Sequence, residues 1–422
     1  MNRFIFKSYS FDDVTTTAHF QYGFEGGRTF EESIKFNSTT SHDSKLLDRA
    51  LFLAFVLIGT SYYKCFPSNE VVIDTVLDEW QADFFTHVYQ EGLGQFAYEN
   101  HLERKDLARF KATTDETIDL VPYSGSGVLT LQSGGKDSLL VATLLNENHQ
   151  DFTAWYLSSS DAHPSVLDKV APTLELAVRT IDREGIQKAV SGGALNGHVP
   201  ITYIVQSLAV IQAILVGKSD ILVSVAHEGE EPHDHIGDLA VTHQWSKTWA
   251  AETAFADYVN RYISPTIRIG SPLRGYSELR VAELFVQNSW EKYGHQFSSC
   301  NVANYGQGAD NTHLKWCGNC PKCANSYLLF APFLASDELK NIFNDQDLFT
   351  KPTLEQTFKG LLGIDDVPKP FECIGEIDEL RLAYQKSQAK GGYKPLPFEV
   401  PESTFDYMQK YPAQDWAAKM LQ

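Results

Sequence analysis

The segment from residue 133 to residue 138 reads SGGKDS, a combination of glycines, hydroxyls, a lysine and an aspartate that suits phosphate binding. Two adjacent glycines let the backbone bend tightly and bring its N–H groups close to a polyphosphate, and the start of a following helix adds its positive end. Lys136 supplies a point charge at what we expect to be a solvent-facing turn, and Asp137 is placed to help hold magnesium. We therefore predict a phosphate-binding turn made of Ser133, Gly134, Gly135, Lys136, Asp137 and Ser138, with a purely structural turn as the alternative.

Cysteines form the second pattern with chemical meaning. Four of the six lie close together in the sequence: Cys300, Cys317, Cys320 and Cys323. The last three form C-x2-C-x2-C, and four thiolates suit a closed tetrahedral zinc site that would staple a region lacking a core of its own. An iron–sulfur cluster or free thiols are the alternatives. The other two, Cys65 and Cys373, are expected outside this site as ordinary core or surface thiols.

These residues need a scaffold, and the apolar pattern predicts one. From residue 128 onward, short apolar runs alternate with longer ones. The predicted strands are Val128–Leu131, Phe152–Leu157, Leu174–Val178, Ile221–Val225 and Thr266–Ile269. The predicted helices are Leu139–Leu145, Ile201–Val216, Trp249–Ile263 and Ser277–Tyr293, preceded in the N-terminal region by Lys45–Tyr63 and Asp78–Asn100. This alternation predicts an α/β fold with a doubly wound parallel sheet covered on both faces. Ligands of such sheets bind beyond the carboxyl ends of the strands, where SGGKDS falls.

A length of 422 residues predicts two or three domains. The Ser/Gly-rich break at 124–127 and the end of the strand–helix alternation near residue 295 divide the chain into three parts. We predict an N-terminal α+β region for substrate recognition over 1–122, a nucleotide-binding domain over 125–295, and a metal-binding and C-terminal region over 296–422.

The composition narrows the possible partners and the location. A formal net charge of -19 argues against a protein that coats nucleic acid, although an anionic small substrate needs only a few well-placed cations. The start of the chain lacks the pattern of a signal peptide. The most apolar early run, Leu51–Gly59, is about half the length that crosses a bilayer. We expect a cytoplasmic protein with no nucleic-acid or membrane partner.

The SGGKDS hexapeptide resembles the PP-loop of the ATP pyrophosphatases and lacks the spacing of a Walker loop. The resemblance covers roughly residues 125–295 and implies a doubly wound sheet that binds ATP and Mg2+, splits ATP between its α- and β-phosphates and transfers AMP to a substrate oxygen. Ser271-Pro272-Leu273 followed by Ser277-Glu278-Leu279 looks like the late strand-to-helix turn of that family. The family often has Lys at the start of that helix, so a phosphate contact there is in doubt in this chain.

Several further segments resemble the MurL-type UDP-N-acetylmuramoyl-L-alanyl-L-glutamate epimerases. They are SYYK at 61–64, FAYEN at 96–100, ALNGHVP at 194–200, HQWSK at 243–247, FSSC with KWCGNCPKC, and KPFECIGE at 369–376. The resemblance implies that ATP adenylates a carboxylate of the terminal L-glutamate, that the α-proton then leaves and returns on the opposite face, and that hydrolysis gives the D-isomer. It also implies a muramoyl dipeptide substrate, and a ligase that adds L-glutamate as a functional partner.

An epimerase needs acid/base groups and donors for the enolate oxygen, and the matching segments supply four candidates: His198, His243, Lys247 and Glu228. We expect His198 to open a helix after a Gly-rich turn. His243 and Lys247 are four residues apart and would share one face of a helix. Glu228 follows the fourth predicted strand. For each of them, an ordinary core or surface role is the alternative.

Two other groups of charged residues are weaker candidates. The acidic stretch 228–238 and its neighbourhood contain three histidines, His227, His233 and His235, and predict either a mobile lid or a solvated loop. Arg179, Arg268 and Arg274 lie at or after strand ends, where they would meet phosphates or form ion pairs.

Two other functions remain open from the sequence. The first is a PP-loop ligase or a tRNA- or nucleobase-modifying enzyme similar to the 7-cyano-7-deazaguanine synthases, which have a similar zinc arrangement. The acidic balance of the chain weighs against tRNA. The second is a nucleotide sensor attached to a zinc module. This non-enzymatic function does not explain why many polar segments lie along the carboxyl edge of the sheet.

Overall fold

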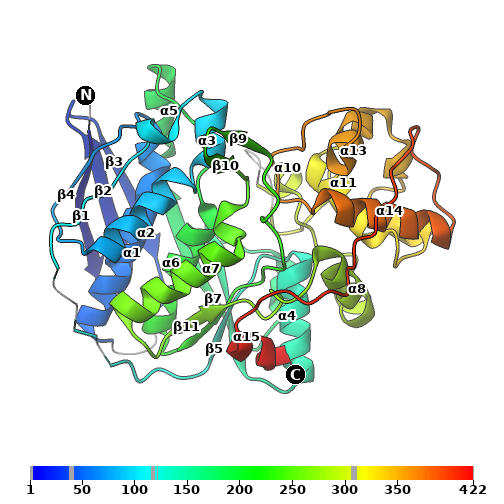
Figure 1. Cartoon of the computed structure of the whole chain (residues 1–422). Helices are drawn as coiled ribbons and strands as arrows, with labels where there is room; N and C mark the ends of the chain where they lie inside the picture. Colours follow the sequence, from blue (N-terminus) through cyan, green and yellow to red (C-terminus); the bar gives the residue numbers. More distant parts are fainter. Residues whose placement is uncertain (1–2, 38–41, 116–118, 121, 306–310, 422) are drawn as a thin grey trace.

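The computed structural model describes residues 3–37, 42–115, 119–120, 122–305 and 311–421. Its centre is a nine-stranded sheet in the order β11-β8-β5-β6-β7-β3-β2-β1-β4 (Figure 1). The strands are β1 (Phe4–Asp12), β2 (Thr17–Phe24), β3 (Thr29–Lys35), β4 (Val71–Ile73), β5 (Val128–Leu131), β6 (Phe152–Ser158), β7 (Leu174–Ile181), β8 (Asp220–Leu222) and β11 (Arg268–Gly270). A separate hairpin consists of β9 (Asp234–Ile236) and β10 (Leu239–Val241).

The five strands predicted from the sequence are confirmed as β5, β6, β7, β8 and β11, and they form the parallel part of the sheet. Strand β8 ends earlier than predicted, at Leu222. Beyond that point the chain bonds to the β11 side instead, because Val223 N donates to Gly270 O and Val225 N to Ser271 Oγ.

Both faces of the parallel sheet are buried, as predicted. Leu129 and Trp155 point into one hydrophobic core, whereas their neighbours Val128, Ala154 and Tyr156 point into a second one. The first core contains α1 (Ser44–Tyr63), α2 (Glu79–Gln90), α6 (Ile201–Leu215) and α7 (Trp249–Tyr258). The second contains α4 (Lys136–Glu147), α8 (Glu278–Asn288), α11 (Pro321–Phe330), α13 (Glu355–Leu362) and α14 (Ile377–Lys390). Shorter helices are α3 (Gly94–Glu99), α5 (Arg183–Ser191), α9 (Trp290–Tyr293), α10 (Asn301–Asn304), α12 (Ser336–Ile342) and α15 (Asp415–Ala418).

The sequence predicted a purely parallel sheet, but the N-terminal strands make the sheet mixed. β3 pairs antiparallel with β7, and β2 and β1 continue the sheet as an antiparallel meander. The sheet therefore runs across the predicted boundary near residue 122.

Helix α1 is long and apolar enough to cross a membrane, so the estimate of a half-length apolar run at 51–59 was too short. Its most apolar window is 89% buried inside the protein. The helix begins at Asp43, whose carboxylate accepts the N–H groups of Lys45 and Leu46, and it packs against α6 and β1. It is a core helix of this fold.

Two of the predicted helices are interrupted. The pattern over 78–100 divides into α2 and α3, because the chain turns at residues 91–93, where a side chain at Gly92 would meet Val88 O at 2.4 Å. The pattern over 277–293 divides at Ser289 into α8 and α9.

The region after residue 295 does have a buried interior, contrary to the sequence-based expectation. Helices α11, α13 and α14 pack on one another, and α11 and α14 also contact α8, so this region shares the second core (Figure 1). The C-terminal segment then returns to the sheet, where Gln414 Nε2 donates to Ile269 O at 3.0 Å.

Candidate active site

The site is built where the parallel sheet changes direction. In the sheet, β6 and β7 lie on one side of β5, whereas β8 and β11 lie on the other. The connections after β5 and β8 therefore diverge at their carboxyl ends, the usual ligand position in such sheets, and we call the region between these two connections the crevice. The SGGKDS turn follows β5, and the segment leading to Glu228 follows β8.

The turn has the backbone that a phosphate site needs. Gly134 has a φ of 78°, a region that side-chain-bearing residues rarely adopt. Ser133 N donates to Ser138 Oγ at 3.3 Å, and that hydroxyl donates to Gly135 O at 3.2 Å, which closes the turn. Helix α4 starts at Lys136 with Gly135 as its N-cap, so no side chain at the cap accepts the N–H groups of the first turn. These N–H groups are directed at any anion bound there.

Lys136 is buried, not solvent-facing as the sequence suggested; its exposed fraction is 8%. Its ammonium lies 2.7 Å from Asp137 Oδ1. Burial lowers the pKa of Lys136, but the charges of Asp137 and Glu278 outweigh this and raise the pKa above its ordinary value. The lysine is therefore held as a cation inside the turn.

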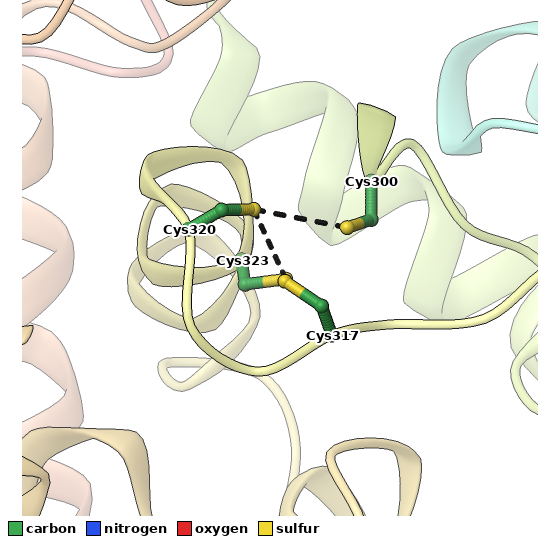
Figure 2. Close-up of side chains that lie close together, drawn as sticks. All are labelled: Cys300, Cys317, Cys320 and Cys323. Atoms are coloured by element: carbon green, nitrogen blue, oxygen red, sulfur yellow. Dashed lines mark hydrogen bonds between the residues drawn. The ribbon is translucent and has the colours of Figure 1, made fainter. Parts of the chain in front are cut away.

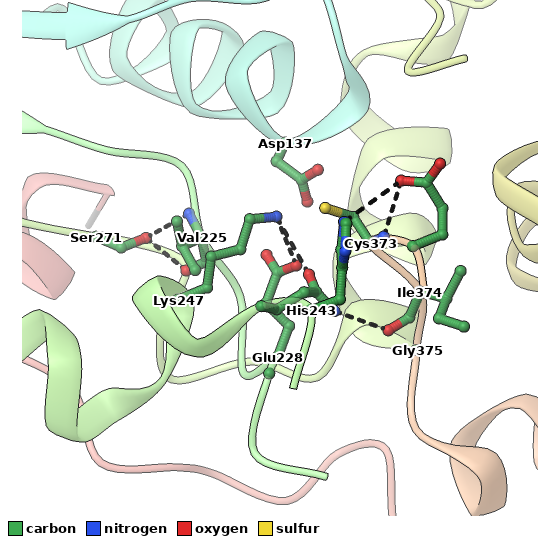
Figure 3. Close-up of polar contacts among 12 residues, drawn as sticks. Asp137, Val225, Glu228, His243, Lys247, Ser271, Cys373, Ile374 and Gly375 are labelled. Carbon is green, nitrogen blue, oxygen red and sulfur yellow. Dashed lines mark hydrogen bonds and ion pairs between the residues drawn. The ribbon is translucent and has the colours of Figure 1, made fainter. Parts of the chain in front are cut away.

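Two buried carboxylates face this cation from other elements. Glu278, the first residue of α8, has no hydrogen-bond partner for Oε2 among the described residues, and burial together with the Glu228 charge raises its pKa. Glu228 forms a 2.9 Å ion pair with Lys247 (Figure 3). Burial raises the pKa of Glu228, but the charges of Lys247, Lys322 and Lys136 lower it to about 2. Glu228 and Lys247 thus act as a fixed ion pair, not as free proton acceptors.

The segments that resembled one family converge beside this turn, although they are far apart in the sequence. Lys64 of SYYK donates to Gly197 O at 2.9 Å, and Asn100 of FAYEN donates to Asn196 O at 3.1 Å. These contacts fix the ALNGHVP loop, where the ring of His198 lies 4.4 Å from the ring of His243, centroid to centroid.

Neither histidine has the local structure that the sequence predicted. His198 lies in the loop three residues before α6 and does not open the helix. His243 lies in a turn that precedes a single 3-10 turn, Trp245–Lys247, so it does not share an α-helical face with Lys247. Tertiary packing brings the groups together instead.

Burial keeps both imidazoles neutral at physiological pH. It lowers the pKa of His198 to about 3, with the charges of His243 and Lys64 adding to the effect. It also lowers the pKa of His243 to about 4, although Glu372 opposes this. His243 Nδ1 lies 2.6 Å from Gln95 Oε1, and Gln95 Nε2 donates to Glu99 Oε1 at 2.8 Å. Since an amide oxygen only accepts, Nδ1 carries the proton and Nε2 of His243 is a free base.

The KPFECIGE segment supplies a group that the sequence-based assignment missed. Cys373 lies outside the four-cysteine cluster, as expected, but it is not an ordinary surface thiol. Its Sγ, the carboxylate of Glu372 and a ring nitrogen of His243 all lie within 4.8 Å of one another. In Figure 3 the sulfur points toward Asp137, Lys247 and His243. In the sequence, only its position within KPFECIGE, a segment that resembles one family, could have indicated that Cys373 belongs to the site.

The acidic stretch with three histidines contacts several other elements of the protein. It contains β9, which pairs with β10 just beyond it, and ion pairs connect it to other elements through Glu231 with Lys369 and Asp238 with Arg104. His233 stacks on Phe371 at 4.9 Å, and burial lowers its pKa to about 4. His227 stacks on Tyr411 at 3.6 Å, whereas His235 is exposed on β9.

The three arginines form ion pairs instead of meeting the turn. Arg179 pairs with Glu32 at 2.6 Å, Arg268 with Asp220 at 2.7 Å, and Arg274 with Glu252 at 2.8 Å. Arg268 and Asp220 start β11 and β8, at the sheet edge opposite the turn. Arg274 also donates to Lys247 O at 2.6 Å and so positions the HQWSK segment.

The side chains of the four clustered cysteines point toward one another (Figure 2). The sulfur separations are 3.7 Å for Cys300–Cys320, 3.7 Å for Cys317–Cys323 and 3.5 Å for Cys320–Cys323. Four sulfurs at about 2.3 Å from one metal ion would be separated by about 3.8 Å, so this donor set fits a tetrahedral ion. Cys65 is buried in the first core, away from this cluster.

Comparisons with known proteins agree over nearly the whole chain. The family model of the MurL N-terminal domain matches residues 1–270, and that of the MurL C-terminal domain matches residues 296–398. A UDP-N-acetyl-alpha-D-muramoyl-L-alanyl-L-glutamate epimerase from Xanthomonas oryzae pv. oryzae is 32% identical over 402 residues, which cover 93% of this chain and 87% of the relative. Epimerases of the same name from Salinispora tropica and a Micromonospora species are each 31% identical, with 94% and 91% of this chain covered and 87% and 86% of the relatives.

Proposed function

This chain belongs to the MurL family of epimerases, and we propose on that premise that it inverts the terminal L-glutamate of UDP-N-acetylmuramoyl-L-Ala-L-Glu. The reaction would serve peptidoglycan precursor synthesis, downstream of a ligase that adds L-glutamate to a muramoyl-alanine precursor. The observation that carries the proposal is the convergence of polar segments from five places in the chain on one crevice, beside a phosphate-binding turn.

The proposed reaction begins with ATP, because a free carboxylate resists loss of the neighbouring α-proton. Its negative charge disfavours a second negative charge on the adjacent carbon. Transfer of AMP to the carboxylate removes that charge and lets the carbonyl accept electron density, while pyrophosphate leaves. The SGGKDS turn supports this step through its directed N–H groups and the buried Lys136 cation. We assign the turn to the PP-loop class of ATP pyrophosphatases.

Magnesium fits the same crevice. Asp137 and the unpartnered Oε2 of Glu278 are oxygen donors beside the turn, the ligand type that Mg2+ prefers. Bound there, the ion would neutralise charge on the phosphates. In its absence the positive charge of Lys136 lies next to these two carboxyl groups, whose negative charges raise the pKa of the lysine.

The proton-transfer step falls to the two neutral imidazoles. His243 presents Nε2 as a free base, and His198 stacks against it. Both are unprotonated at pH 7, because burial lowers their pKa values, so each has a ring nitrogen that is free to take a proton from the activated substrate. Lys247, held by Glu228 and by Gln244, supplies a fixed positive charge for the developing enolate oxygen.

We also assign the four clustered cysteines to a structural zinc ion. All four positions are taken by protein ligands, which leaves no open position for chemistry. The cluster joins the loop of Cys300 to the start of α11, next to the KPFECIGE segment, so it would hold one wall of the crevice in place.

An acceptor screen tests the proposed activity and its alternative. The protein is incubated with ATP and Mg2+ plus the muramoyl dipeptide, a nucleobase carboxylic acid or tRNA, and AMP with pyrophosphate is measured. We expect the muramoyl dipeptide alone to trigger AMP formation. AMP formation with tRNA or the nucleobase acid, and none with the dipeptide, would instead indicate an enzyme similar to the 7-cyano-7-deazaguanine synthases.

The same screen with the Lys136→Ala variant tests whether the SGGKDS turn binds the phosphates of ATP. We expect it to lower AMP formation at least about a hundredfold, because a buried cation that faces the phosphates is lost. The substitution also leaves buried carboxylates uncompensated, so its melting temperature should fall. Circular dichroism must confirm a folded protein, and unchanged turnover of that folded variant would refute the phosphate-site assignment.

A further inference from the structure

Cys373 is the one nucleophilic side chain described in the crevice that the proposed reaction leaves without a task. It lies in the loop after Phe371, and Lys322 of α11 donates to its backbone carbonyl. Its own N–H donates to Glu372 Oε1 at 2.9 Å, so both backbone groups of the residue are anchored. Its sulfur points toward Asp137 of the phosphate turn and toward His243 (Figure 3).

The neighbours of this thiol form the chain of contacts that activated cysteines use. A nucleophile needs a base within reach, and the base needs a third group that fixes its ring. His243 lies within 4.8 Å of Sγ, and its Nδ1–H is held by Gln95, which Glu99 holds in turn. The arrangement of thiol, imidazole and amide oxygen is the one used for acyl transfer by cysteine enzymes on unrelated folds.

A buried cation, Lys247, lies beside the sulfur (Figure 3). Lys247 is a buried cation whose pKa burial lowers, while the negative charges of Cys373 and Glu228 outweigh burial and raise it. Lys247 is therefore placed to stabilise negative charge that develops on the sulfur as it attacks. The neighbouring Glu372 carboxylate accepts hydrogen bonds from Asn301 Nδ2 at 3.1 Å and from Cys373 N at 2.9 Å.

We propose that Cys373 takes the activated glutamyl group from AMP and carries it as a thioester. The sulfur attacks the carbonyl carbon of the acyl-adenylate, so a C–S bond forms and the C–O bond to AMP breaks. AMP leaves with the bonding electron pair, and the thiol proton passes through His243 Nε2 to the solvent, which leaves this nitrogen free for the inversion. After inversion at the α-carbon, water cleaves the C–S bond: its hydroxyl completes the carboxylic acid and its remaining proton goes to the sulfur.

The inference rests on the proposed adenylation, and it adds a reason for the position of Cys373 between the turn and the imidazoles. A thioester carbonyl accepts electron density well, so the α-proton stays acidic after AMP has left. The covalent bond also holds the α-carbon near His198 throughout inversion.

The test is a rapid acid quench of the full-length enzyme with ATP, Mg2+ and isotopically labelled muramoyl dipeptide. Intact mass spectrometry should find the glutamyl substrate attached to the protein, proteolysis should place it on Cys373, and neutral hydroxylamine should release it. Cys373→Ala and Cys373→Ser should lose inversion and AMP release by at least about a hundredfold, yet still exchange labelled pyrophosphate into ATP. Cys65→Ala removes a thiol from the first core and should still form the adduct.

Several results would overturn the thioester. These are Cys373→Ala inverting glutamate within about threefold of wild type, loss of pyrophosphate exchange together with inversion, or α-proton exchange without inversion in that variant. A second metal ion per chain that depends on Cys373 and His243 would contradict it as well. The proposed function fails separately, if wild-type enzyme releases AMP and leaves the glutamate in the L-configuration.

Discussion

At the scale of single residues, burial decides which groups in the crevice carry charge. The two imidazoles are neutral because burial lowers their pKa values, whereas Lys136 and Lys247 stay charged because carboxylates compensate for their burial. The lysines can therefore stabilise negative charge, and the histidines can accept protons. The sequence suggested these lysines and histidines as site residues, but it did not show which of them would stabilise charge and which would transfer protons.

Glu379 offers a pH-dependent test of this electrostatic account. It is buried below the crevice and accepts Leu279 N at 2.7 Å, and burial with the nearby Glu278 raises its pKa to about 8. A raised carboxyl pKa contributes stability below about pH 4.5, and this stability is lost as the pH rises through 8. Chemical denaturation of Glu379→Gln at a series of pH values should give a flatter decline of unfolding free energy from pH 5 to 8 than wild type. An identical slope in both proteins would contradict the assignment.

Cys373 marks the limit of residue-level prediction. The SGGKDS turn and the four-cysteine cluster could be found in the sequence, because each lies within a short stretch or has a regular spacing. Cys373 becomes a neighbour of His243 only through packing of segments 130 residues apart, and no local spacing records that contact.

At the scale of elements, the parallel half of the sheet was predictable and the N-terminal half was not. Continuous apolar runs such as Val128–Leu131 predict buried strands. The junction between β3 and β7 depends instead on long-range pairing, together with a buried ion pair between Glu32 and Arg179. Glu32 also accepts a hydrogen bond from Tyr62 at 2.7 Å, which ties α1 to this junction.

Removing the carboxylate at this junction should be costly. Glu32→Ala leaves Arg179 buried without its partner, and we expect a loss of about 3–5 kcal/mol in unfolding free energy, measured by urea denaturation. Glu25→Ala, which breaks an exposed pair with Arg3 in the neighbouring turn, is the control and should have little effect. Equal effects of the two substitutions would mean that the junction does not stabilise the fold.

The cysteine cluster is the second element-scale test. Metal analysis of purified protein should find about one zinc per chain, and chelation should lower the melting temperature, because the ion joins segments that are separated in the sequence. Cys320→Ser should bind less zinc, whereas Cys65→Ser should keep it. Iron with absorption in the visible range would mean that the cluster holds a different metal.

At the scale of the whole molecule, the three predicted parts of the chain all contribute to one site. Gln95 comes from the N-terminal region, His198 and His243 from the central α/β part, and Cys373 from the C-terminal region. The sequence predicted most of these segments through a family resemblance spread over the chain. It did not predict their geometry, since His198 and His243 meet through loops whose shape depends on contacts from Lys64 and Asn100.

The most direct test of this account is the reaction of the muramoyl-L-Ala-L-Glu substrate with the enzyme, ATP and Mg2+ in deuterated water. Because inversion must pass through loss of the α-proton after adenylation, the D-glutamyl product should carry deuterium at its α-carbon. Omitting ATP should stop both exchange and inversion, and His198→Ala or His243→Ala should lose inversion while some AMP release survives. AMP release with an L-glutamate that has become amidated or joined to an amine, and carries no deuterium, would contradict the account and identify a ligase.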